Sequence, residues 1–282
     1  MTLICILVAF GLEYYLGNLD QYRKLDWFDR YCVWMELNFS KLTVWQGPLG
    51  VLFTLIPPLL VLVAVASLLA KLSIVVFYLF MVAVFLYNLG PSVNHLLNNY
   101  IAALEEGDES RVTQIENRLL ATKEGREEDD LYRILLVRAH DNLFAMIFWF
   151  TILGIIGVLL VNLVIHLRER YAGIHGDYPD VVDTLYKILI WPSSRLLALG
   201  FALGGSLVDA LEGWGRVEGF SLDSSRQVLI SSGLGAIQHK QDQFRETAEH
   251  IEILQQIQAL INRALIIWLT VMGIMTITGW LA

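Results

Sequence analysis

Four long apolar stretches dominate the pattern of the chain. A helix that crosses a bilayer needs about 20 mainly apolar residues. Four stretches meet or approach that length with no internal charge, namely Leu49–Ala70, Leu72–Gly90, Phe144–Leu167 and Ala264–Ala282. Buried core helices of soluble proteins rarely continue so far without a polar face, which makes that alternative the weaker one. The pattern therefore predicts an all-α integral membrane protein with four transmembrane helices.

The first 48 residues combine a short apolar segment with an amphipathic one. Residues 1–16 are short for a full span and carry Glu13 near their end, so we expect a tilted or half-buried helix. No basic stretch precedes them, which is not typical of a signal peptide. In residues 20–40 the apolar positions recur at helical spacing, and they are Leu25, Phe28, Cys32, Met35 and Phe39. Neighbouring tryptophans favour the headgroup level of a membrane, although packing against another helix is the alternative.

A second irregular segment lies at residues 185–208. It is apolar overall but contains Pro192 and Arg195. Because a proline inside a helix removes a hydrogen bond, we predict a broken or re-entrant helix here. Gly200 and Gly204 form a GxxxG pair, which lets another helix approach closely.

The stretch 91–143 is polar, yet its pattern predicts three helices. The first two cover Ser92–Leu104 and Glu109–Lys123. The third begins near Asp129 and continues into the span that starts at Phe144. We therefore expect helical loops outside the membrane.

These elements form one predicted membrane domain, residues 1–282. Its parts are an N-terminal membrane segment with the amphipathic helix (1–48), a helical pair (49–90), an acidic helical loop (91–143), a span (144–167), a loop with the broken helix (168–208), a polar loop with a long helix from about Gln241 (209–262) and a C-terminal span (263–282).

Composition supports the membrane class. Hydrophobic residues make up 56% of the chain and charged residues 17%, whereas a soluble domain is about 25% charged. The net charge of −8 is local, because ten acidic and four basic residues lie between Glu105 and Asp130. A solvated helical face explains this run better than a partner-binding patch. No basic patch suggests a nucleic-acid partner.

Lysine and arginine positions bear on orientation, since they concentrate on the cytoplasmic side. If residues 1–16 and 185–208 both cross, one side holds 17–48, 91–143 and 209–263, with 4, 6 and 5 basic residues, and the other holds Lys71, Arg168 and Arg170. That split places the acidic loop in the cytoplasm. If neither segment crosses, the basic residues divide almost evenly.

Common catalytic and metal-binding signatures are missing from the sequence. We find no phosphate loop, HExxH or GxSxG motif, and the two cysteines form no CxxC pair, so no metal site or disulfide is expected. Ionisable groups at membrane depth are the stronger candidates, because desolvation makes them costly. The candidate polar, ligand-binding cluster is Glu13, Arg138, His140, Asp141, Asn142, Asn162, Asp183 and Arg195.

Two interpretations of that cluster remain open. Arg195 is expected to pair with Glu13, Asp141 or Asp183, which would bring these side chains together around a ligand. Alternatively, the same groups form ion pairs and hydrogen bonds that only lock helices together.

A set of scattered residues carries a family resemblance over nearly the whole chain. They are the start Met1-Thr2-Leu3 with the apolar run to Glu13, Gly90, Tyr100 with Ala102 and Ala103 before the Gly107-Asp108 turn, Asn142, and Asp183, Trp191, Arg195 and Leu196. In these positions the chain resembles the AmpE family, within the wider CobD/CbiB superfamily.

The resemblance implies a regulatory, non-enzymatic protein of the bacterial inner membrane. It would take part in cell-wall sensing and β-lactamase induction, which is an antibiotic response. Its implied protein partner is a cytoplasmic muropeptide amidase, beside the lipid bilayer. A separate alternative is a membrane protein that binds a lipid or muropeptide in a pocket between the broken segment and the other spans, with Glu13 and Arg195 as polar contacts. No cofactor is expected.

The CobD/CbiB branch offers an enzymatic alternative, the Mg-ATP-dependent amide-forming synthesis of adenosylcobinamide phosphate. Asp141 and Asn142 keep the first part of that family's motif, but Ala145 stands where an acid follows. In a second motif Asn162 remains, while Ile165 replaces the acid. Since carboxylates hold the metal and phosphates in such reactions, these losses argue against that chemistry.

Overall fold

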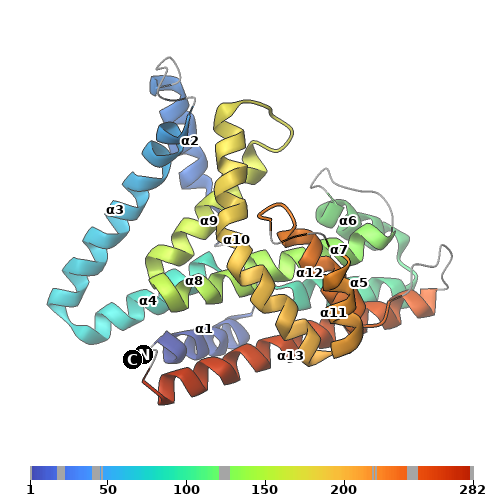
Figure 1. Ribbon diagram of the computed structural model, residues 1–282. Helices are drawn as coiled ribbons and strands as arrows, with labels where there is room; N and C mark the ends of the chain where they lie inside the picture. The colour runs from blue at the N-terminus through green and yellow to red at the C-terminus, as the bar shows by residue number, and fades with distance from the viewer. Residues whose placement is uncertain are drawn as a thin grey trace. The chain divides into compact units, whose positions relative to one another are not determined.

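The structure, a computed structural model, describes residues 2–17, 23–39, 45, 47–120, 128–217, 219, 221–239 and 247–279. Every regular element in this part of the chain is a helix (Figure 1). Four helical stretches have the length and composition to cross a membrane, namely Pro48–Leu72, Ile74–Glu106, Leu131–Leu153 and Thr247–Ile277. The second and third of these stretches each contain more than one helix. The predicted all-α class with four candidate spans is thus confirmed, although the third candidate, Leu131–Leu153, replaces the predicted stretch Phe144–Leu167.

The chain divides into two compact units. Unit 1 comprises Met1–Gly90, Ala145–Leu189 and Thr278–Ala282, and unit 2 comprises Pro91–Phe144 and Ile190–Ile277.

Unit 1 begins with four helices that follow the predicted order. They are α1 (Thr2–Leu16), α2 (Asp26–Phe39), α3 (Pro48–Leu72) and α4 (Ile74–Asn88). Helix α3 starts with a proline, which fits the first helical position because its missing N–H has no partner there in any helix. Helices α3 and α4 meet at Ser73, where the chain turns sharply, and they diverge from this corner (Figure 1).

The predicted span Phe144–Leu167 is wrong as a single helix. It is divided into α8 (Ala145–Leu153) and α9 (Ile155–Arg170), with Gly154 between them at a φ of 63°. With a ψ of −146°, this backbone conformation is essentially restricted to glycine, so Gly154 allows the turn. A Cβ atom on Gly157 would lie only 2.5 Å from the Trp149 carbonyl oxygen, which shows how sharply α9 folds back.

The predicted break in residues 185–208 is also wrong. Helix α10 runs without interruption from Asp177 to Gly204 with Pro192 inside it, and Val208 belongs to the next helix. Hydroxyl groups donate to carbonyls next to the proline: Ser193 Oγ bonds Ile190 O at 3.2 Å and Ser194 Oγ bonds Trp191 O at 3.1 Å. The backbone bond that Pro192 removes is the one to Ile188 O, and the helix continues past this single lost bond.

Unit 2 contains the three helices predicted for residues 91–143. They are α5 (Val93–Glu106), α6 (Glu109–Leu120) and α7 (Glu128–Ala139). Gly107 ends α5 at a φ of 68°, and the Asp108 carboxylate accepts from the Arg111 N–H at 3.1 Å. The predicted end of the second helix, Lys123, lies outside the described residues. After α7 comes a π-helical turn, His140–Phe144, which leads into α8.

The predicted polar loop at 209–240 contains two helices instead. They are α11 (Leu207–Gly215) and α12 (Ser225–Ala236), which pack closely side by side (Figure 1). A Cβ atom on Gly213 would lie 2.3 Å from Ser231 O, and one on Gly235 would lie 2.4 Å from Asp209 O. Gly213 and Gly235 therefore allow the backbones of α11 and α12 to approach closely, and they do not form turns.

Helix α13 (Thr247–Ile277) completes unit 2 and confirms the long C-terminal helix. Its predicted start near Gln241 lies outside the described residues. A Cβ atom on Gly200 would lie 3.2 Å from Trp268 Nε1, and one on Gly204 would lie 3.3 Å from Arg263 Cβ. The predicted GxxxG pair thus brings α10 and α13 into close contact.

Candidate functional site

A buried hydrogen-bonded chain lies at the π-helical turn of unit 2. Asp141 Oδ1 lies 2.7 Å from His140 Nδ1, and Ser193 Oγ lies 2.8 Å from His140 Nε2. The residues are 8%, 1% and 0% exposed for Asp141, His140 and Ser193. π-helical turns often occur at functional sites, since they turn side chains away from the regular helical spacing. The sequence pointed to His140 and Asp141 but gave no sign of Ser193.

The order of atoms in this chain is that of a nucleophile, a base and an orienting carboxylate. Two observations argue against acyl transfer. Ser193 has no exposed surface, and its hydroxyl also lies within hydrogen-bonding distance of Ile190 O. A hydroxyl has one proton to donate, so a bond to that carbonyl leaves none for His140. The geometry is better suited to locking the π-helical turn onto α10.

Arg195 lies two residues further along α10 and is only 7% exposed. Its guanidinium donates to Ser225 Oγ at 3.1 Å, Ser224 Oγ at 3.2 Å and Ser221 O at 3.1 Å. It also lies 4.5 Å from the centre of the Trp191 ring, a cation–π contact. These serines lie at or just before the start of α12, in a stretch whose composition indicated a loop, so this setting was not predicted.

The remaining predicted residues of unit 2 lie close to the same turn in sequence. Asn142 donates to Pro91 O at 3.2 Å. Arg138 is half-buried in the last turn of α7, where the helix dipole favours a cation.

Unit 1 gives Glu13 a partner that the sequence pattern did not indicate. Arg23 NH2 donates to Glu13 Oε1 at 2.8 Å. The same guanidinium donates to Leu86 O and Gly90 O, each at 3.1 Å. Glu13 and Arg23 therefore connect the end of α1 to the end of α4.

The other predicted residues of unit 1 form separate contacts. Asn162 donates to Asn88 Oδ1 at 2.8 Å. Asp183 accepts from Arg168 Nε at 2.9 Å and pairs with Lys187 Nζ at 2.7 Å. Within this unit Glu13, Asn162 and Asp183 thus have different partners, as expected of groups that hold helices together.

A further polar cluster joins α2 to the end of α9. Asp29 Oδ1 lies 3.0 Å from His166 Nε2 and 3.1 Å from Arg170 NH1, while Glu36 accepts from Arg170 and Tyr171. Partial burial alone would raise the pKa of Asp29, but the bonds with His166 and Arg170 outweigh it and hold that pKa below 3.8.

This cluster overturns the charge split used for orientation. The split put residues 17–48 and Arg170 on opposite sides of the membrane, whereas Asp29 and Glu36 bond Arg170 directly. Groups in contact at these distances lie on one side. The error came from treating 144–167 as one crossing, because the turn at Gly154 brings the chain back.

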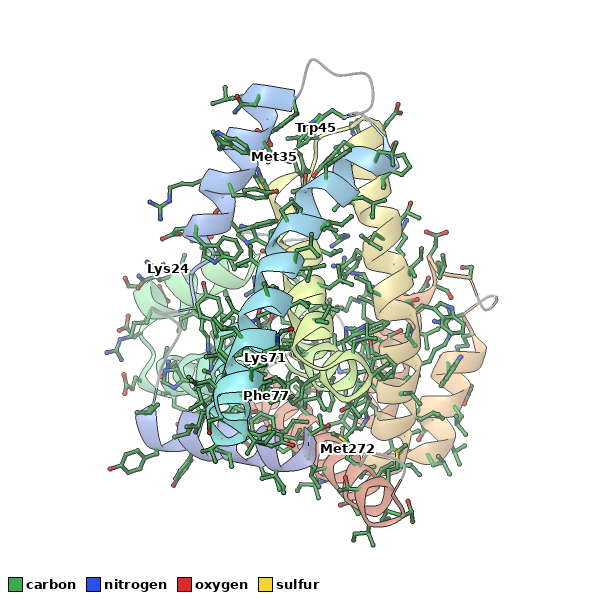
Figure 2. The ribbon with its side chains drawn as sticks, turned by 90° about the vertical axis from the view of Figure 1, so that its left-hand side faces the viewer. Lys24, Met35, Trp45, Lys71, Phe77 and Met272 are labelled. Carbon is green, nitrogen blue, oxygen red and sulfur yellow. The ribbon has the colours of Figure 1, made fainter. Side chains whose placement is uncertain are left out.

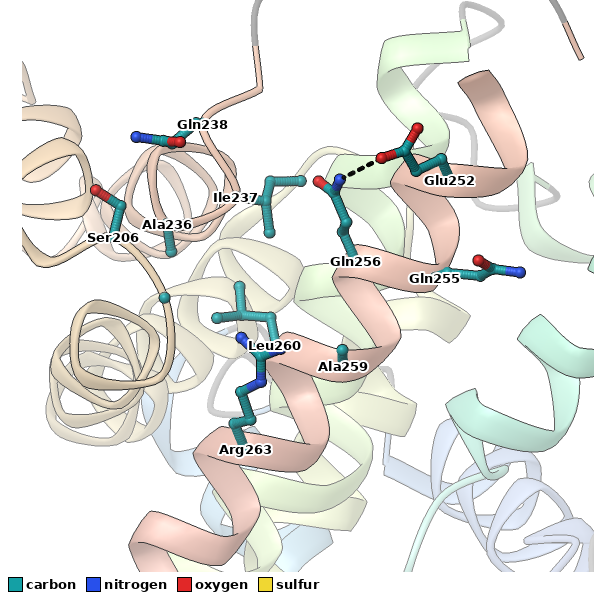
Figure 3. A pocket seen from close by; sticks show the side chains of 11 residues that line it. Ser206, Ala236, Ile237, Gln238, Glu252, Gln255, Gln256, Ala259, Leu260 and Arg263 are labelled. Carbon is teal, nitrogen blue, oxygen red and sulfur yellow. Dashed lines mark hydrogen bonds between the residues drawn. The ribbon is translucent and has the colours of Figure 1, made fainter. Parts of the chain in front are cut away.

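Unit 2 also contains an open cavity of about 510 Å³ between the end of α10, the end of α12 and α13 (Figure 3). Its lining residues are Gly205, Ser206, Ala236, Ile237, Gln238, Glu252, Gln255, Gln256, Ala259, Leu260 and Arg263. The volume is in the range of about 300–1,000 Å³ that small-molecule sites occupy.

Polar groups of the cavity are held by their neighbours. Arg263 NH1 donates to Gly204 O at 3.1 Å, and Gln256 Nε2 donates to Glu252 Oε1 at 3.2 Å. A guanidinium has five N–H donors, and a single carbonyl oxygen cannot accept bonds from all of them. Along α13, Glu252, Gln256 and Arg263 are spaced by four and seven residues, which puts them on one face of the helix. Carboxamide groups, a carboxylate and a guanidinium therefore line the side of the cavity that α13 forms.

No family model, curated protein or solved structure matches the chain.

Metal ligation has no evident place in the described part of the chain. There, no group of three or more His, Cys, Asp or Glu side chains is arranged to hold a metal ion.

Proposed function

We propose that this chain is a regulatory membrane protein of the AmpE type, and that the cavity of unit 2 binds the ligand to which it responds. The cavity, with its polar lining, is the observation that carries the proposal. Cell-wall sensing, β-lactamase induction, the bacterial inner membrane and a muropeptide amidase as cytoplasmic partner are parts of the proposal that rest on the resemblance.

The lining favours a hydrophilic ligand over an acyl chain. Gln238 and Gln256 each offer donors and an acceptor, Glu252 offers acceptors and Arg263 offers donors. A molecule rich in amide, hydroxyl and charged groups matches this set. A muropeptide fits these groups better than a lipid tail.

Helix α13 gives the cavity a route to the membrane. It lines the cavity with Glu252 and Arg263 and continues to Ile277 as a candidate span. A ligand that binds one arrangement of α13 more tightly than another shifts the balance between them. This is how binding at the cavity would reach the membrane-embedded part.

The test uses the purified full chain and a synthetic disaccharide–peptide fragment of peptidoglycan. Titration calorimetry should show saturable binding, and Gln256→Leu should weaken it roughly tenfold, the effect of losing about 1.4 kcal/mol of hydrogen bonding. Gln114→Leu is the matched control, since Gln114 is exposed on α6. Absence of binding, or equal affinity in the parent and Gln256→Leu, would contradict the proposal.

The regulatory part has its own readout in the producing bacterium. Cells that carry Gln256→Leu should differ from the parent in β-lactamase activity after exposure to a β-lactam, in the direction that deletion of the protein gives. If cells whose variant has lost ligand binding still induce β-lactamase like the parent, the cavity has no part in regulation. That result would contradict the proposed regulatory role.

The amide-forming alternative gains less from the structure. Asp141, its one retained acid near the motif, bonds His140 and is not among the residues that line the cavity. Mg-ATP binding that disappears in Asp141→Asn would favour this alternative.

A further inference from the structure

Helix α2 carries two apolar stripes, one buried and one exposed. Phe28, Cys32 and Met35 are buried in unit 1. On the outer side, Trp34 is 54% and Leu37 76% exposed. A helix on the surface of a soluble protein usually has one apolar stripe and a polar outer face, so the second stripe needs a partner.

The rotation of α2 is fixed by its polar side. Asp29 and Glu36 bond Arg170 at the end of α9, and Tyr31 donates to Phe53 O of α3 at 3.3 Å. These contacts leave Trp34 and Leu37 facing outward. Trp27 lies beside them and is 40% exposed, and its N–H donates to Tyr87 Oη of α4 at 3.2 Å. The outer stripe cannot turn inward without breaking the ion pairs.

Ring contacts place α2 beside the end of an apolar helix. Trp34 packs against Phe39 with ring centres 5.9 Å apart, Phe39 stacks on Trp45 at 6.2 Å, and Trp45 stacks on Tyr178 at 5.7 Å. Trp45 precedes the candidate span α3 by three residues. Figure 2 shows Met35 and Trp45 near one end of α3 and Lys71 near the other.

We propose that α2 lies along the bilayer surface, with Trp27, Trp34 and Leu37 in the boundary between headgroups and acyl chains. Tryptophan favours this level because its ring is apolar and its N–H is polar. Arg30 is exposed between the two tryptophans on the same side, where its guanidinium can reach lipid phosphates.

Lipid explains this surface better than a second protein. The exposed stripe of α2 lies beside the ring contacts that lead from Trp34 to the start of α3. The next exposed side chains of α3 are Leu49, Leu52 and Phe53, which are apolar. A bilayer that surrounds α3 therefore meets α2 at its surface. The proposal concerns unit 1 and is independent of the cavity in unit 2.

The experiment measures the depth of α2 in the full chain reconstituted in lipid nanodiscs. Leu37→Cys carries an environment-sensitive fluorophore, and lipids carry a nitroxide either near the headgroup or near the end of the acyl chain. We expect stronger quenching by the headgroup-proximal nitroxide. Leu60→Cys, at a 62% exposed position in the middle of α3, is the control and should show the reverse order.

Leu37 is largely exposed, so its replacement should leave the fold intact. Cys5 and Cys32 are buried, and the labelled parent chain corrects for any reaction at them. Quenching of Leu37→Cys by iodide in water but by neither lipid would overturn the proposal. Disulfide-linked dimers of Leu37→Cys without lipid quenching would overturn it as well, in favour of a second copy.

Discussion

Arg195 shows at the scale of one residue how the protein buries a charge. The guanidinium is held by hydroxyl and carbonyl oxygens of residues 221–225 and by the Trp191 ring. A buried charge is costly unless it is well hydrogen-bonded, and a planar guanidinium can bond several acceptors at once. The sequence identified Arg195 as a special residue, because a charge in an apolar segment stands out. It could not identify serines about 30 residues away as partners.

Arg195→Lys should therefore destabilise the protein although the charge is kept. A lysine ammonium is a compact group on a flexible stem and cannot reproduce the spread of the three acceptors. We expect a loss of about 1–3 kcal/mol in the free energy of unfolding, the cost of buried hydrogen bonds left unmade. Thermal unfolding in detergent measures it. Arg263→Lys, in the open cavity, is the control, and equal midpoints for both variants would argue against this role of Arg195.

At the scale of the element, glycine is the residue type whose role was hardest to predict from the sequence. Glycine and serine between residues 209 and 240 have the composition of a loop, yet they form α11 and α12. Gly154 lies in an apolar run that has the composition of a span, yet it turns the chain. In both cases the absence of a Cβ atom matters, and only the tertiary structure shows whether it serves a turn or a close contact.

Gly213→Ala tests the contact between α11 and α12. The new methyl group would meet Ser231 O at 2.3 Å, so the helices must move apart, at a cost of about 1–3 kcal/mol in unfolding free energy. Gly215→Ala on the same helix has no atom within 4 Å of the new methyl group and should leave stability unchanged or slightly raised. Thermal unfolding compares them. Equal behaviour of the two variants would show that α11 and α12 do not pack as described.

At the scale of the whole molecule, long apolar runs were the reliable signal. Two predicted spans correspond to α3 and α4, and the last corresponds to the end of α13. Long apolar runs are informative because buried helices of soluble proteins seldom stay apolar over such lengths. The side of each loop was not predictable in this way. The turn at Gly154 reverses the direction of the chain between α8 and α9, and no charge pattern marks it.

If the candidate span α3 crosses a membrane, helix α2 and the α9–α10 turn lie at the same face of it, because Asp29 and Glu36 bond Arg170. Cysteines introduced one at a time at Asn38, Ala172 and Lys71, all exposed, can be labelled with an impermeant maleimide in right-side-out and inverted membrane vesicles, with the parent chain as the control for the buried Cys5 and Cys32. We expect Asn38→Cys and Ala172→Cys to be labelled from the same side and Lys71→Cys from the opposite side. Labelling of Asn38→Cys and Ala172→Cys from opposite sides would contradict this arrangement.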